Sequence, residues 1–186
     1  MDNTCQLRQL MTLGANINAI GIEERFEQIA KMLFESFAIQ KGEKKYLFKD
    51  IEFYFYNKNH RDIITHPRVS KPLCWYVNDF GGIDLNFESK IKFENRLNSK
   101  GKNVMRYVLD ESAYFGGVLI RQLKEVESGE ILKGPLACAE LFRCYDATGV
   151  DHDFPILVEH DNGMVGYIRK PRVNLLRSKQ SVEDKV

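Results

Sequence analysis

The sequence predicts a single α+β domain, with a curved, mostly antiparallel sheet and flanking helices. Its length of 186 residues suits one domain, and its 44% hydrophobic and 28% charged residues are typical of a globular chain. After one amphipathic helix, the patterns run strand, hairpin, strand, helix and hairpin, an order that favours the α+β class. The chain has no repeat or Pro/Gly-rich linker. We therefore expect an N-terminal arm over 1–22, the domain over 23–175 and a C-terminal tail over 176–186.

The first predicted element is an amphipathic helix that begins at Glu23 and ends before Gly42. Six apolar residues recur at helical spacing and would face the core: Phe26, Ile29, Ala30, Leu33, Phe34 and Phe37. A strand over residues 46–56 follows, because aromatic and β-branched side chains dominate this segment.

Side chains alternate along a strand, so one face of 46–56 would carry five mostly apolar residues, Leu47, Lys49, Ile51, Phe53 and Phe55. The other face would carry two carboxylates and two tyrosines, Asp50, Glu52, Tyr54 and Tyr56. Carboxylates interleaved with aromatic rings are unusual on an ordinary solvent face. We therefore expect this second face to form the floor of a pocket.

A hairpin and a further strand are predicted in the middle of the chain. Residues 73–78 and 83–87 flank a turn that contains Gly81 and Gly82, which is a hairpin pattern. Residues 117–123 form a short strand with Arg121 among apolar neighbours. A buried guanidinium is costly without a carboxylate, so Arg121 needs an acidic partner.

The last predicted elements are a helix and a second hairpin. Gly134 and Pro135 open a helix through Arg143, with proline at a tolerated first-turn position. An Asp-Asn-Gly turn at 161–163 joins residues 154–160 to 164–168, which predicts two paired strands.

Charge is balanced overall but unevenly distributed. The formal net charge is +1, from 27 basic and 26 acidic residues, which argues against a histone-like DNA-binding protein. Residues 88–107 hold six Lys or Arg and two Glu, and residues 168–180 hold five Lys or Arg and no acid. Residues 144–161 hold five acids and no Lys or Arg. The basic segments could form one face that binds a polyanion. They could equally be solvated charges on unrelated faces of the protein.

Neither a membrane span nor secretion is indicated. The longest apolar runs fall far below the ~20 residues that a span needs, and the first twenty residues lack the apolar core of a secretory signal. The four cysteines, Cys5, Cys74, Cys138 and Cys144, show no CxxC spacing and are interpreted as reduced thiols of a cytoplasmic protein.

Two triplets contain metal-ligating residue types, at 151–153 (Asp-His-Asp) and 159–161 (Glu-His-Asp). Nothing in the sequence brings them together, so no metal is predicted. The chain also lacks a Gly-rich phosphate loop, a GxSxG elbow and an HExxH motif. Nucleoside-triphosphate, α/β-hydrolase and zincin chemistry are therefore unsupported.

Seven segments, in this order, resemble the alkyladenine or 3-methyladenine DNA glycosylase family: AKMLFESF (30–37), IEFYFY (51–56), HRDIITH (60–66), LCWYVNDFGGIDLN (73–86), GVLIRQL (117–123), KGPLACAELF (133–142) and KPRV (170–173). The likeness covers roughly residues 25–175. It implies a monomeric base-excision enzyme with one domain and no cofactor. Its substrate would be damaged DNA, in which it hydrolyses the N-glycosidic bond of an alkylated or deaminated purine that is flipped out through the minor groove.

The resemblance also implies a catalytic set. Glu52 would activate the attacking water, Arg121 would hold that water beside Glu52, and the main-chain carbonyl of Val173 would complete the water site. A nearby guanidinium favours the ionised form of a carboxylate, which suits a base for water.

The base-binding set implied by the resemblance comprises two stacking rings, Tyr54 and Tyr76, a histidine that contacts the base, His66, and an amide that crowds a normal guanine, Asn86. Aromatic faces suit an extruded base, which is commonly held between rings. Asp79 stands where the family has an aromatic wedge, and the adjacent Phe80 is our candidate for that role.

Five basic residues between 88 and 107 are candidates for phosphate contact, namely Lys90, Lys92, Arg96, Lys100 and Lys102. A solvated loop is the alternative interpretation of this stretch.

Other interpretations remain open for the whole chain. Residues 66–73 (HPRVSKPL) are shorter than the family's loop at this point, which favours a non-catalytic or redirected member that binds a nucleobase, a nucleoside or nucleic acid. A third hypothesis is an interaction domain whose pocket is filled by its own side chains. Under it, Glu52 and Arg121 form only a structural ion pair.

Overall fold

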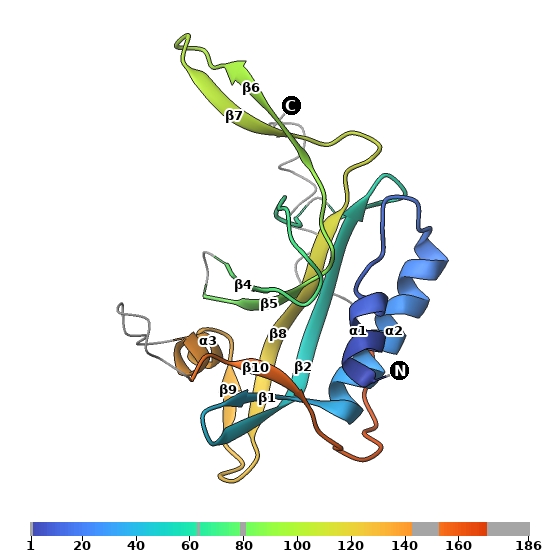
Figure 1. The fold of residues 1–186 in the computed structure, drawn as a ribbon, viewed down its shortest axis with the longest axis vertical. Coiled ribbons are helices and arrows are strands. Elements are labelled where there is room, and N and C mark those ends of the chain that lie inside the picture. Colours follow the sequence, from blue (N-terminus) through green and yellow to red (C-terminus); the bar gives the residue numbers. More distant parts are fainter. Residues whose placement is uncertain (1, 63, 79–80, 143–152, 171–186) are drawn as a thin grey trace.

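An antiparallel sheet organises the fold, with two long strands at its centre, β2 (Lys44–Asn57) and β8 (Phe115–Glu125) (Figure 1). The structure is a computed structural model that describes residues 2–62, 64–78, 81–142 and 153–170. The strand order is β10-β1-β2-β8-β5-β4, with β3 paired to β2 and β9 paired to β8. The shorter strands are β1 (Phe37–Lys41), β3 (His60–Arg61), β4 (Trp75–Val77), β5 (Ile83–Asn86), β9 (Ile131–Lys133) and β10 (Ile156–Glu159).

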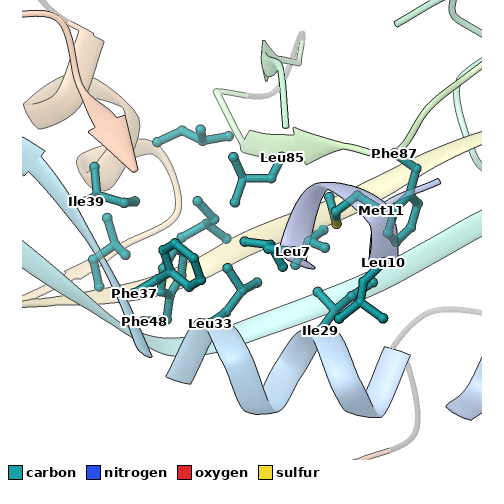
Figure 2. Close-up of a cluster of buried hydrophobic side chains, with 14 of the residues drawn as sticks. Leu7, Leu10, Met11, Ile29, Leu33, Phe37, Ile39, Phe48, Leu85 and Phe87 are labelled. Atoms are coloured by element: carbon teal, nitrogen blue, oxygen red, sulfur yellow. The ribbon is translucent and has the colours of Figure 1, made fainter. Parts of the chain in front are cut away.

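Two helices cover one face of the sheet. These are α1 (Asn3–Leu10) and α2 (Ala19–Ser36), which lie side by side next to β2 (Figure 1). Apolar side chains from both helices meet those of the sheet in one core, and Figure 2 shows ten of them by name, Leu7, Leu10, Met11, Ile29, Leu33, Phe37, Ile39, Phe48, Leu85 and Phe87.

The N-terminal segment that we expected to form a loose arm is part of this core. Leu7 and Met11 are fully buried, and the side chain of Asp2 accepts a hydrogen bond from the Cys5 N–H at the start of α1. Only a short stretch of this segment is apolar, so its periodicity is weak, and packing against α2 decides its conformation.

The long helix begins earlier and ends sooner than predicted. The side chain of Asn18 accepts a hydrogen bond from the Gly21 N–H, which fixes the start of α2 before Glu23. Phe37 was predicted to belong to the helix, but it begins β1. Phe37, Ala38 and Ile39 are all fully buried, a continuous apolar run that suits a strand between β2 and β10.

A β-bulge near Asp50 changes which side chains of β2 face the helices. The register with β8 shifts on both sides of Asp50. As a result an even-numbered residue, Phe48, faces the core before the bulge, and an odd-numbered residue, Phe55, faces it after the bulge. The predicted alternation for residues 46–56 is therefore wrong for Lys49 and its neighbours, and right for residues 51–56.

The predicted hairpin at 73–87 is confirmed as β4 and β5, and the strand at 117–123 is confirmed within β8. The helix that opens at Pro135 is confirmed as α3 (Pro135–Phe142). The single tryptophan, Trp75, packs edge-on against Phe142 of this helix, and its indole N–H donates to the carbonyl of Pro155 (2.9 Å).

The second predicted hairpin is wrong. β10 pairs with β1, and residues 164–168 form no strand. The residues of the expected turn bind the end of α2 instead, because the Asn162 side-chain amide donates to the carbonyls of Phe34 (2.8 Å) and Phe37 (3.0 Å). These bonds satisfy carbonyl groups that a helix end leaves without partners.

The basic stretch forms a separate two-stranded ribbon, β6 (Lys92–Leu97) and β7 (Asn103–Val108), which extends away from the main sheet (Figure 1). A solvated loop is therefore not what this segment forms. Within the described residues, no helix combines the length and the apolar character needed to cross a membrane.

Leu33 provides a test of the helix-to-sheet core. The side chain is fully buried in the core cluster, so Leu33→Ala leaves a cavity and should lower the free energy of unfolding by about 2–5 kcal/mol. Urea unfolding followed by circular dichroism measures this change. Lys31→Ala, at an exposed position of the same helix, should change it by less than about 0.5 kcal/mol. Equal effects of the two substitutions would contradict this packing.

Candidate functional site

The sheet face away from α1 and α2 carries most of the predicted site residues, because the strand registers align them. Tyr76 of β4 lies opposite Asp84 of β5, Asp84 lies opposite Leu119 of β8, and Leu119 lies opposite Glu52 of β2. Directly opposite residues share a face of the sheet. These four side chains therefore form one row across four strands.

A second row lies beside the first on the same face. Asn86 of β5 and Tyr54 of β2 both lie opposite Gly117 of β8. Since side chains two residues apart on a strand point the same way, Tyr54 shares the face of Glu52, and Asn86 shares that of Asp84. This sheet face therefore combines side chains from four strands, and Glu52 and Tyr54 are its members from the predicted face of residues 46–56.

Glu52 and Arg121 form the ion pair that the sequence led us to expect. The Arg121 guanidinium donates through Nε (2.9 Å) and Nη2 (2.5 Å) to a single carboxylate oxygen, Glu52 Oε2. The Glu52 side chain is 14% exposed, whereas that of Arg121 is 48% exposed. An ion pair with a half-exposed guanidinium adds little to stability. Its effect is to fix the position of the Glu52 carboxylate near the solvent boundary.

A buried polar cluster lies next to this pair, made by Tyr54, Arg68 and Asp84. The side chains of Arg68 and Asp84 are 8% and 3% exposed, with Nη2 3.6 Å from Oδ2. Arg68 also donates to the Tyr54 hydroxyl, and that hydroxyl hydrogen-bonds the Asp84 carboxylate. A charge this deeply buried persists in proteins only when it is paired.

Arg68 lies over both predicted stacking rings. Its guanidinium carbon is 5.1 Å from the ring centroid of Tyr54 and 4.4 Å from that of Tyr76, within the range of cation–π attraction. A planar cation of this chain thus contacts the ring faces that the resemblance assigns to a flipped base.

Gly117 is required beneath this cluster. A Cβ at this position would lie 3.0 Å from Arg68 Nη2, 3.0 Å from the Tyr54 hydroxyl and 2.8 Å from the carbonyl oxygen of Leu85. The absence of a side chain therefore lets Arg68 and Tyr54 lie directly on the sheet.

Four buried polar side-chain atoms have no hydrogen-bond partner within the described part of the chain, and three of them belong to residues on or over this face. They are Thr65 Oγ1, Arg68 Nε, Asp84 Oδ1 and Asn86 Oδ1. Asn86 uses only its amide group, which donates to Ser70 Oγ (2.9 Å). Unsatisfied buried groups are costly, so two acceptors and one charged donor on this face are available to a ligand or to water.

The electrostatics of Asp84 place His66 and Arg121 near the same carboxylate. Burial raises the pKa of Asp84 above its usual value, while Tyr54, Arg68, His66 and Arg121 act in the opposite direction. His66 itself is exposed. The strand registers and the ion pair thus bring Glu52, Tyr54, Tyr76, Asn86 and Arg121 to one region, and the charge of His66 acts on the Asp84 carboxylate there.

Other predicted residues are not part of this region. Val173, Phe80 and the predicted tail at 176–186 lie outside the described residues. The phosphate-contact candidates are all exposed: Lys92 and Arg96 are on β6, Lys100 and Lys102 are in the β6–β7 turn, and Lys90 precedes β6.

The triplets of acids and histidines do not form a ligand set within the described residues. No group of three or more His, Cys, Asp or Glu side chains there is arranged to hold a metal ion. Asp151 and His152 lie outside the described part of the chain, while Glu159 accepts hydrogen bonds from Thr4 of α1.

Sequence reasoning missed Arg68 and Asp84. A signal for Asp84 was present, because it alternates with Ile83 and Leu85 and must share the face of Asn86. Arg68 lies in an irregular segment, where no periodicity indicates a direction. The position of Asp84 in the predicted strand could have indicated that a cation pairs with it, but not which residue supplies that cation.

Comparison with known proteins identifies one relative and no family. An uncharacterized protein of Acanthamoeba polyphaga mimivirus is 27% identical over 142 residues, which is 69% of this chain. The chain spans 62% of the length of that viral relative. No family model matches the sequence, and no solved structure matches the fold.

The Arg68–Asp84 pair predicts a non-additive mutational effect. Arg68→Ala leaves the Asp84 carboxylate buried and unpaired, so the free energy of unfolding should fall by about 3–5 kcal/mol. Adding Asp84→Asn removes the charge, and the double variant should recover most of that loss. A double-mutant cycle from urea unfolding measures the coupling. Additive losses would show that the two side chains do not interact.

The buried phenol of Tyr54 should make the free energy of unfolding decrease at alkaline pH. Burial raises the pKa of its phenol well above the usual value of about 10. Above pH 10 the unfolded state therefore loses the proton first, and the free energy of unfolding should decline as pH rises. Urea unfolding between pH 9 and 11 measures the slope, and Tyr54→Phe should make it shallower. An unchanged slope in the variant would mean that Tyr54 titrates normally.

Proposed function

We propose that this protein is a divergent DNA glycosylase of the alkyladenine type, which hydrolyses the N-glycosidic bond of a damaged purine. The observation that carries the proposal is the Glu52–Arg121 pair on the same sheet face as Tyr54, Tyr76 and Asn86. A positioned carboxylate beside aromatic rings supplies the two requirements of the reaction, a base for water and a surface that holds an extruded base.

The chemistry assigned to Glu52 is general-base catalysis. A water held beside the Glu52–Arg121 pair attacks C1′ of the deoxyribose and passes a proton to Glu52, while the bond from C1′ to the purine nitrogen breaks and its electron pair leaves with the purine. The products are a free base and an abasic site. By analogy with sugar hydrolysis, the transition state has oxocarbenium character, which a nearby carboxylate stabilises.

Base recognition is assigned to the buried face. The purine would stack on Tyr54 and Tyr76 in place of the Arg68 guanidinium, which is itself planar and holds both ring faces. Asp84 Oδ1 and Asn86 Oδ1 are acceptors without partners among the described residues, and they suit N–H groups on the edge of a base. Entry of a base therefore requires Arg68 to withdraw from the rings, and N–H groups of the base then replace it beside the buried Asp84 carboxylate.

An excision assay tests the proposal. Duplex and single-stranded oligonucleotides carrying hypoxanthine, ethenoadenine or 3-methyladenine are incubated with the protein, and alkali then cleaves any abasic site. Glu52→Gln should lower the excision rate by about 100-fold or more, because a general base contributes about 10²–10⁴. The matched control Glu43→Gln, at an exposed turn position, should leave the rate unchanged. No excision by the wild-type protein on any of these substrates would refute the proposal.

One observation favours a second candidate, a member of the same fold that binds a nucleobase or nucleoside without cutting DNA. Arg68 already covers the rings of Tyr54 and Tyr76, as expected of a pocket that has changed its role. The same samples discriminate the two functions. Binding of free adenine or hypoxanthine by calorimetry, without excision of any lesion, would establish the second.

A further inference from the structure

The β6–β7 ribbon has one face without charge. Cross-strand pairing joins Phe93 to Tyr107, Asn95 to Met105 and Leu97 to Asn103, and opposite residues share a face. The alternate pairs place the charged residues of the strands, Lys92, Glu94, Arg96 and Arg106, on the other face.

The uncharged face is open to solvent. Phe93 and Tyr107 are each 52% exposed, and Leu97 and Met105 are 69% and 70% exposed. A two-stranded ribbon is marginally stable by itself, so an exposed apolar stripe on a projecting ribbon marks a surface that meets a partner. The paired aromatic rings are the largest part of that stripe.

The charge of the ribbon indicates what the partner is. Between Lys92 and Val108 there are five Lys or Arg and one Glu. Lys92 pairs with Asp110 (2.6 Å), and Arg96 pairs with Glu94. The side chains of Lys100, Lys102 and Arg106 have no acidic partner within the described residues. The uncompensated charge beside the apolar stripe is therefore positive.

We propose that the ribbon binds single-stranded DNA, with bases stacked on Phe93 and Tyr107 and phosphates held by Lys100 and Lys102 of the turn. Rings beside cations are the common arrangement for unpaired strands, because every base offers a flat face. In a duplex those faces are already stacked on one another. A second copy of the chain is disfavoured, since it would bring like charges together. The choice of DNA as the polyanion rests on the proposed function.

Direct binding tests the ribbon independently of catalysis. The anisotropy of a labelled, undamaged single-stranded oligonucleotide and of its duplex is measured with the full-length protein. Phe93→Ala with Tyr107→Ala should weaken binding of the single strand by about tenfold or more, and wild-type protein should prefer the single strand. The control Ile20→Ala removes an apolar side chain of similar exposure (69%) from α2, and it should have no effect.

The contribution of the phosphates is measured by salt dependence. For single strands, each phosphate contact contributes about 0.7 to the slope of the logarithm of the binding constant against the logarithm of the salt concentration. Lys100→Gln with Lys102→Gln should therefore make the slope shallower by about 1.4, and Lys133→Gln, at an exposed position of β9, should not change it. All these positions are exposed, and circular dichroism checks that each variant folds.

The outcomes separate the ribbon from the catalytic proposal. Ring-dependent binding of the undamaged strand without excision would support the ribbon and refute the enzyme. Excision with unchanged binding in the ring variant would refute the ribbon alone. Equal or tighter binding of duplex, insensitive to the rings, would also refute it. A dimer in sedimentation that the ring substitutions convert to a monomer, with no DNA bound, would assign the stripe to a second copy.

Discussion

The burial of Arg68 and Asp84 is the constraint on which the far side of the sheet depends. Each side chain is almost fully enclosed, and neither charge is tolerable there without the other. Their pairing draws the irregular segment that carries Arg68 onto β5 and β8. Tyr54 and Gly117 belong to the same arrangement, since the phenol hydrogen-bonds both charged groups and the glycine leaves room for them.

Because of this constraint, the two acidic side chains on this face, Asp84 and Glu52, lie in different environments. Asp84 is buried beneath Arg68 and has a raised pKa, so its main effect is structural and selective. Glu52 is held by a half-exposed guanidinium at the solvent edge, where a water molecule can approach. The two acids therefore receive different roles in the proposed reaction.

The sequence predicts the outline of this site because strand alternation is a simple rule. Glu52 and Tyr54 share a face by spacing alone, and Glu52 is the acid beside Arg121, although the Arg121 side chain is half-exposed and not buried as its apolar neighbours in the sequence led us to expect. The same rule fails at Asp50, because a bulge adds a residue to β2 and leaves no local signal. Helical spacing fails in turn for Phe37, because its packing between strands overrides the helical pattern of the residues before it. Arg68 was beyond prediction because only tertiary contacts fix a side chain in an irregular segment.

The indole of Trp75 lies one residue before Tyr76, but it points to the opposite side of β4 and packs against α3. Since the chain has no other tryptophan, tryptophan fluorescence arises from a single place, next to Tyr76 on β4. Small displacements of β4 would alter this emission while the main core stays intact. The molecule thus contains a built-in optical probe that can distinguish local rearrangement of β4 from loss of the whole fold.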